Sequence, residues 1–214
     1  MRALPEVRIE DLLGREEIRI NMEEIAGSLK GKVVLVTGAA GSIGSELCRQ
    51  LCHFGLKQLV LFDSAETPMH NIRLELEEKF PDVEFTPVMG DIRMIHRVES
   101  IYQRFRPHIV FHAAAYKHVP LMEENPCEAV HTNVYGTRNV ADMAVKYDVD
   151  KFIMVSTDKA VNPTNVMGAS KRLAEMYVQS LSIAISKGRQ SGKTRFITTR
   201  FGNVLGSNGS VIPR

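Results

Sequence analysis

The sequence predicts an α/β fold built on a doubly wound parallel sheet. Short apolar runs alternate with amphipathic runs along the chain, and this alternation requires parallel strands joined by helical crossovers. A turn with three glycines joins the first expected strand to the first expected helix. An aspartate ends the second expected strand. Together these three features are typical of a Rossmann-like sheet, which we expect over residues 31–214.

The individual elements follow from hydrophobic periodicity. The expected strands cover residues 33–36, 58–62, 83–88, 108–112, 151–155 and 195–200. The expected helices cover residues 45–54, 67–79, 92–105, 128–147 and 166–187. Residues 1–30 are charge-rich, and we expect a short packed segment or junction there and not a domain. Residues 187–194 predict a polar loop.

The first turn holds Gly38, Gly41 and Gly44 at a spacing of three. The first glycine permits a sharp turn, the second lets backbone N–H groups approach phosphate oxygens, and the third lets the helix pack closely on the strand. Ser42 and Ile43 lie at the start of the helix, whose N-terminus attracts a pyrophosphate. The pattern therefore predicts a dinucleotide-binding loop.

Asp63 lies 19 residues after Gly44, close to the ~20 expected of a carboxylate that binds an adenosine ribose. A carboxylate there favours the free 2′-hydroxyl of NAD and repels the 2′-phosphate of NADP. The alternative is that Asp63 only begins a turn with Ser64.

Ligands of an open parallel sheet lie at the carboxyl ends of its strands. Asp91 and Ile92 follow the third strand, where the carboxylate could accept from an adenine amino group or cap the next helix. Ala113, Ala114 and Ala115 follow the fourth. Their small side chains would let a cofactor lie flat against the backbone, although ordinary packing also explains them.

Two polar clusters complete the candidate site. Tyr116, Lys117 and His118 continue the loop after the fourth strand and are candidate substrate contacts. Hydroxyl, acid and amine side chains follow the fifth strand at Ser156, Thr157, Asp158 and Lys159. A turn with a surface ion pair is the alternative for the second cluster.

Composition limits the classes of function. The 214 residues are 44% hydrophobic and 24% charged, which indicates a soluble globular chain. The net charge of +2 gives no strong positive electrostatic field that would attract nucleic acid or anionic lipid. No apolar run approaches the ~18 residues of a membrane span. Three cysteines without zinc spacing indicate reduced thiols and no metal site.

The glycine loop, the aspartate after the second strand, His112 with the alanines that follow it, and Asn133 resemble the extended short-chain dehydrogenase/reductase superfamily. Residues 156–163, 168–171 and 200–213 narrow the resemblance to CapD-like nucleoside-diphosphate-sugar 4,6-dehydratases of bacterial polysaccharide biosynthesis. The resemblance implies NAD as cofactor and a UDP-sugar, UDP-N-acetylglucosamine, as substrate. It also implies cofactor contacts by Asn133 and Lys171 and a substrate contact by Asn203.

One position departs from the superfamily, which uses a Tyr-x-x-x-Lys pair. The lysine is Lys171, but Met167 stands in place of the tyrosine, and a thioether cannot act as a base. Large membrane-anchored members of the group are similar in this respect, so the resemblance implies a dehydratase that retains the C5 configuration. The base for the 4-hydroxyl stays open between Lys171, a neighbouring carboxylate and Tyr116.

The implied reaction is an internal redox cycle. Hydride leaves C4 of the hexose for NAD+, Lys159 removes the C5 proton, Asp158 protonates the departing C6 hydroxyl, and hydride returns to C6. Such an acid needs a raised pKa and such a base a lowered one, whereas pairing of the two side chains would oppose both shifts. A UDP-sugar epimerase and a non-catalytic NAD-binding scaffold are the alternatives.

The resemblance also carries expectations about the protein at its natural length. We expect residues 31–214 to form an incomplete catalytic domain that lacks a C-terminal substrate subdomain. We expect a cytoplasmic location, with a parent protein anchored to the inner membrane although this chain makes no membrane contact itself. A homo-oligomer is expected.

Overall fold

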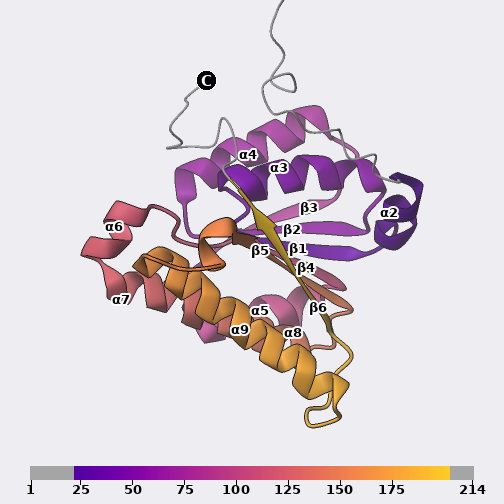
Figure 1. Ribbon diagram of the computed structural model, residues 1–214. Coiled ribbons are helices and arrows are strands. Elements are labelled where there is room, and N and C mark those ends of the chain that lie inside the picture. The colour runs from indigo at the N-terminus through magenta and orange to yellow at the C-terminus, as the bar shows by residue number, and fades with distance from the viewer. Residues whose placement is uncertain (1–21, 203–214) are drawn as a thin grey trace, which may run out of the picture.

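The computed structural model describes residues 22–202, which form a sheet between two layers of helices (Figure 1). The strand order is β3-β2-β1-β4-β5-β6, and every neighbouring pair is parallel. The strands are β1 Val33–Thr37, β2 Gln58–Asp63, β3 Phe85–Met89, β4 Ile109–His112, β5 Lys151–Thr157 and β6 Arg195–Phe201. This order confirms the doubly wound fold and places its switch point between β1 and β4.

Helices cover the two faces unequally. Helices α3 and α4 lie on one face of the sheet, and α5, α8 and α9 lie on the other (Figure 1). The helical segments are α2 Met22–Leu29, α3 Ser42–Leu51, η1 Cys52–Phe54, α4 Glu66–Lys79, α5 Ile95–Phe105, α6 Val119–Glu124, α7 Pro126–Ala129, η2 Val130–Gly136, α8 Thr137–Lys146, η3 Asp158–Ala160 and α9 Val166–Ser186. Among the helices of residues 22–202, none is long and apolar enough to cross a bilayer.

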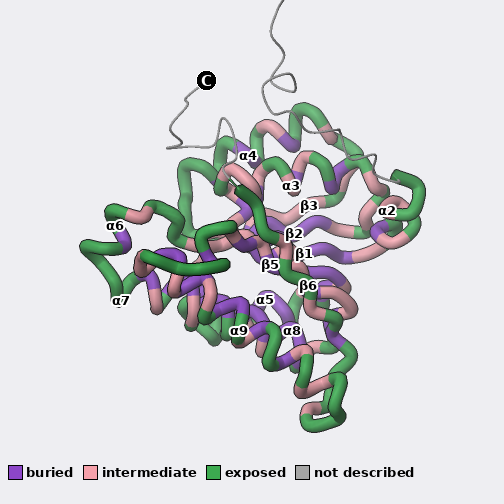
Figure 2. Tube along the Cα trace, viewed as in Figure 1, coloured by how far each residue is buried: buried purple, intermediate pink, exposed green. Residues whose placement is uncertain are grey.

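Strand β1 is buried at all five positions because helices cover both of its faces. Its residues alternate between two apolar clusters. Val34 and Val36 pack with side chains from α3 and α4, whereas Val33 and Leu35 pack with side chains from α5, α8 and α9. The continuous apolar run of β1 thus reflects burial on two sides. Edge strand β6 is mostly exposed by comparison (Figure 2).

Several boundaries differ from the sequence prediction. The expected helix over 128–147 is three segments, with π-helical η2 between α7 and α8. Helix α6 was expected as loop, but Pro120 lies in its first turn, where proline is tolerated because that N–H needs no partner. Strand β5 continues to Thr157, so Ser156 and Thr157 end the strand and do not follow it.

Candidate functional site

The glycine loop lies at the carboxyl end of β1, where the strand order reverses. Gly38 has φ +69°, and a Cβ there would lie 2.5 Å from the backbone nitrogen of Ala114. A Cβ on Gly44 would lie 1.9 Å from the carbonyl oxygen of Gly38. Gly41 caps the N-terminus of α3, and among the described residues a Cβ there would meet only the Gly38 oxygen, at 3.3 Å. The loop therefore needs two glycines for its own packing, and the third leaves the helix N-terminus accessible.

Asp63 joins the end of β2 to this loop. Its Oδ2 accepts from the backbone N–H of Ala40 at 3.0 Å, and its Oδ1 accepts from that of Ala65 at 2.9 Å. The turn interpretation and the ribose interpretation are compatible, because each carboxylate oxygen has a second lone pair for a hydroxyl. The carboxylate lies beside the proposed phosphate loop, as a ribose contact requires.

A buried hydrogen-bond chain connects the carboxyl ends of β1 and β4 to η2. Thr137 Oγ1 donates to the carbonyl of Asn133 at 2.7 Å, so it accepts from His112 Nε2 at 2.9 Å. His112 Nδ1 then accepts from the Thr37 hydroxyl at 2.7 Å. Burial, helped by the charge of Lys171, lowers the pKa of His112 to about 3. The imidazole is therefore neutral, as this hydrogen-bond chain requires.

Acidification should expose the role of His112 in stability. Because its pKa is about 3 in the fold and about 6.5 in an unfolded chain, the unfolded state takes up the proton first. Stability should be complete above pH 6.5 and fall as pH falls toward 3. Buried ionised carboxylates such as Glu175 lose their contribution only below about 4.5. Denaturant titrations between pH 7 and 5 should show this loss in the wild type and not in His112→Gln.

Asn133 positions the loop after β4, and its predicted cofactor contact stays a prediction. Its Oδ1 accepts from the Tyr116 N–H at 2.8 Å, and its Nδ2 donates to the Tyr116 carbonyl at 3.0 Å and to Ser170 Oγ at 2.9 Å. The residue is fully buried. Both amide hydrogens are used by protein groups, so the side chain positions the loop after β4 against α9, and its Oδ1 keeps one lone pair for a further donor.

Met167 and Lys171 lie one turn apart on the buried face of α9. The helix begins after Asn165, whose Oδ1 accepts from the N–H of Gly168 at 2.8 Å. Met167 is buried in a small apolar cluster with Met122. Lys171 Nζ donates to the carbonyl of Val155 at 2.9 Å. Burial lowers the pKa of Lys171 to about 8, against the opposing charge of Glu175.

The cluster at the end of β5 divides between two environments. Ser156 is buried, whereas Asp158 and Lys159 are exposed. Thr157 Oγ1 donates to Asp158 Oδ1 at 2.9 Å, and Lys159 Nζ lies 3.4 Å from the same oxygen. The Thr157 hydrogen bond and the Lys159 charge hold the pKa of Asp158 below its usual value. The ion pair that the sequence left open is thus formed, and this arrangement opposes the shift that an acid needs.

The structure corrects the helix-cap alternative for Asp91, whereas the adenine contact stays a prediction. Asp91 does not cap α5, which begins four residues later; its carboxylate accepts from the backbone N–H and the guanidinium of Arg93. Ile92 is buried and would meet a Cβ on Gly136 at 2.5 Å. Lys117 and His118 are exposed at the loop before α6. The predicted contact Asn203 lies outside the described residues.

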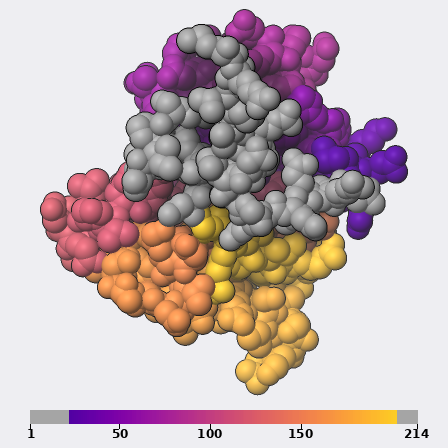
Figure 3. All heavy atoms as spheres, turned by 45° about the horizontal axis from the view of Figure 1, so that its top comes forward, coloured from indigo at the N-terminus to yellow at the C-terminus, as the bar shows by residue number. Residues whose placement is uncertain are grey.

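The predicted residues gather at the carboxyl-terminal end of the parallel strands. The glycine loop, Asp63, the alanines after β4 and the residues after β5 all lie at carboxyl ends of neighbouring strands. Figure 3 shows the surface of α6 and α7 directly beside that of α9 at this end. Sequence reasoning missed Thr37, Thr137 and Glu175. Glu175 could have been predicted, because it follows Lys171 by four residues and therefore lies on the same helix face.

The sheet order and the glycine loop define a Rossmann-like domain of the extended short-chain dehydrogenase/reductase superfamily. Residues 34–214 match the family described as "Polysaccharide biosynthesis protein", and the chain belongs to this family. The predicted resemblance to CapD-like proteins is confirmed. The chain is 49% identical over 211 residues to "Capsular polysaccharide biosynthesis protein CapD" of Staphylococcus aureus, covering 98% of this chain and 34% of the relative.

Two further comparisons agree. "Probable polysaccharide biosynthesis protein EpsC" of Bacillus subtilis is 48% identical, with 97% of this chain and 34% of the relative covered. The solved structure of Pen from Bacillus thuringiensis has a TM-score of 0.76 at 38% identity and covers 86% of this chain and 53% of that one. The chain thus spans about a third of the length of these two relatives and about half of the solved structure.

Proposed function

We propose that this chain is the cofactor-binding part of a nucleotide-sugar-modifying enzyme, which catalyses NAD-dependent 4,6-dehydration of UDP-N-acetylglucosamine for bacterial surface polysaccharide. One observation carries the dehydratase assignment. Asp158 and Lys159 lie beside the first turn of α9, where a Cβ on Gly168 would meet the Lys159 carbonyl oxygen at 2.5 Å. An acid and an amine are therefore next to the helix that carries Met167 and Lys171.

NAD fits the residues present. The accessible N-terminus of α3 suits a pyrophosphate, Asp63 suits a ribose, and the alanines after β4 leave room for a flat ring. The cofactor supplies hydride acceptance and return. Relatives of the fold bound to NAD, such as WbmG of Bordetella bronchiseptica at 22% identity, support this choice through fold alone.

The chain's own groups would move the protons. Lys159 would take the C5 proton, and Asp158 would give a proton to the departing C6 hydroxyl. In the free protein the two form an exposed ion pair. A sugar bound over them would separate the pair and exclude water, and this desolvation would raise the pKa of Asp158 toward that of a useful acid. The base at the 4-hydroxyl stays open between Lys171, a neighbouring carboxylate and Tyr116.

Epimerisation is the second candidate. A protein named "UDP-glucose 4-epimerase" in Rickettsia rickettsii is 39% identical and covers 85% of this chain. An epimerase returns hydride to C4 and has no use for an acid–base pair at C5 and C6, which favours the dehydratase. A cytoplasmic location, a membrane-anchored parent and a homo-oligomer stay predictions.

The test is a mass measurement on the protein at its natural length, incubated with UDP-N-acetylglucosamine and NAD+. Loss of one water from the sugar nucleotide supports the dehydratase. An unchanged mass with an inverted C4 would mean an epimerase, and an unchanged substrate would favour a binding protein.

The cofactor preference is a separate prediction. The chain should bind NAD+ more tightly than NADP+, because Asp63 would face the 2′-phosphate of the latter. Calorimetric titration with both cofactors measures the difference, and Asp63→Ser should reduce it. Equal or tighter NADP+ binding by the wild type would remove Asp63 from the ribose site.

Met167 should tolerate an apolar replacement. Met167→Leu keeps a similar volume in the cluster with Met122 and should cost less than ~1.5 kcal/mol of stability. Because a thioether cannot act as a base, turnover at natural length should stay within about tenfold of wild type. Steady-state kinetics on purified variants measure this. A loss of several orders of magnitude would give the thioether a direct role.

A further inference from the structure

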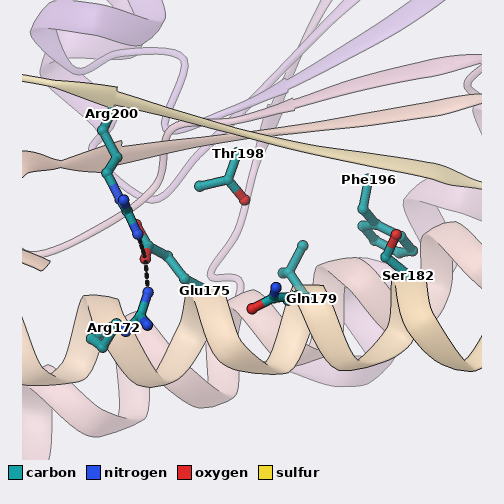
Figure 4. Close-up of a pocket in the computed structure, with 8 residues that line it drawn as sticks. Arg172, Glu175, Gln179, Ser182, Phe196, Thr198 and Arg200 are labelled. Atoms are coloured by element: carbon teal, nitrogen blue, oxygen red, sulfur yellow. Dashed lines mark hydrogen bonds and ion pairs between the residues drawn. The ribbon is translucent and has the colours of Figure 1, made fainter. Parts of the chain in front are cut away.

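Glu175 is a buried carboxylate that connects helix α9 to strand β6. Its side chain is 5% exposed and accepts hydrogen bonds from two arginines. Arg172 on the same helix donates once at 3.1 Å, whereas Arg200 on β6 donates through Nε at 2.9 Å and through an Nη at 2.7 Å. Figure 4 shows both guanidinium groups converging on the carboxylate at one end of a groove between α9 and β6.

The carboxylate stays ionised. Burial alone would raise its pKa, but the hydrogen bonds from Arg200 and Arg172 and the charge of Arg200 bring the pKa of Glu175 down to about 2. A buried ion pair of this kind contributes little net stability, because desolvation offsets the attraction, but its hydrogen bonds fix the geometry of the groups they join.

The register of the sheet places this contact beside the candidate acid and base. Arg200 pairs with Ser156, and the next pair is Phe201 with Thr157, which directly precedes Asp158. A Cβ on Gly202 would lie 3.9 Å from Asp158 Oδ2. Within the described residues β6 pairs only with β5, and the two Arg200–Glu175 hydrogen bonds link this end of β6 to α9.

We propose that Glu175 and Arg200 form a positioning pair, which braces β6 against α9 and so holds the end of β6 at a fixed separation from Asp158 and Lys159 during sugar dehydration. The proposal rests on the proposed function. It assigns no contact with substrate to either residue. It predicts that turnover depends on the link between α9 and β6, and not merely on neutralisation of the Glu175 charge.

Arg172 provides a matched control for this distinction. Arg172 and Arg200 both bind Glu175, and both side chains are 40% exposed. Either change to Gln removes one positive charge from the same carboxylate, but only Arg200→Gln breaks the link between α9 and β6. At natural length, Arg200→Gln should lower kcat for water loss ~10²-fold, as misplacement by about 1 Å can. Arg172→Gln should cost less than ~5-fold, because it leaves the two Arg200–Glu175 hydrogen bonds between β6 and α9 in place.

A second variant and a second measurement keep the outcome decisive. Arg200→Lys retains the charge without the two parallel hydrogen bonds and should fall between wild type and Arg200→Gln. In the 214-residue chain, amide hydrogen exchange should accelerate at residues 157–159 and 199–201 in Arg200→Gln and not in Arg172→Gln. NAD+ affinity should be unchanged in both.

Equal effects of the two glutamine variants on turnover, or unchanged turnover in Arg200→Gln, would overturn the positioning pair. If the wild type releases no water from the sugar, the proposed function is wrong. Amide hydrogen exchange alone then tests whether Glu175 and Arg200 form a positioning pair. Equal exchange in the two variants would reject the brace whatever the reaction is.

Discussion

Gly44→Ala should lower the stability of this domain by about 2–3 kcal/mol, the upper part of the range for overpacking. A Cβ at this position would lie 1.9 Å from the carbonyl oxygen of Gly38 and 2.9 Å from the Cα of Ala39. Both are backbone atoms that a rotamer change cannot move. The gain of ~1 kcal/mol in helix propensity from alanine offsets only part of this cost. Thermal unfolding should shift downward by roughly 5–10 °C.

Gly41→Ala is the control that separates folding from binding. Gly41 has φ −76°, which alanine adopts freely, and within residues 22–202 its added Cβ would meet only the Gly38 oxygen, at 3.3 Å. Replacing a glycine N-cap by alanine should cost under ~1 kcal/mol. The methyl group would nevertheless face the phosphates, so NAD+ affinity should fall ~10-fold or more. Intact NAD+ binding in Gly41→Ala would place the pyrophosphate elsewhere.

Lys159→Met should abolish most dehydration in the protein at its natural length. Removing a general base typically costs ~10²–10⁴ in rate. NAD+ affinity should be nearly unchanged, because Lys159 follows β5 and not the glycine loop. Lys151→Met is the matched control, since it removes the same charge from the opposite end of β5 and should leave turnover intact.

Solvent deuterium exchange at C5, measured beside cofactor reduction, identifies the step. A Lys159→Met enzyme that still reduces NAD+ but no longer exchanges C5 would have lost the base alone. If Lys159 is only the surface partner of Asp158, the change should cost under ~1 kcal/mol of stability and leave exchange as it was. That result would remove Lys159 from the mechanism and weaken the case against an epimerase.

The architecture was predictable because local patterns reflect burial. The apolar run of β1 is buried on both faces, and Gly38 and Gly44 lie where backbone atoms leave no room for a Cβ. Such requirements act within a few residues and leave a direct trace in the sequence. Asp63 was predictable in the same way, since the length of the first helical crossover sets its place at the end of β2.

The sequence by itself therefore determined the sheet, the glycine loop and the cluster of reactive side chains after β5. The tertiary structure decided which partners the predicted side chains have in the fold. It buries Asn133 among the Tyr116 backbone and Ser170, and it pairs Asp158 with Lys159. It also brings Arg200 onto Glu175, 25 residues earlier in the chain. These partners depend on strand order and register. Both bring together residues that are distant in the sequence, and neither produces a local periodic pattern from which the contact could be predicted.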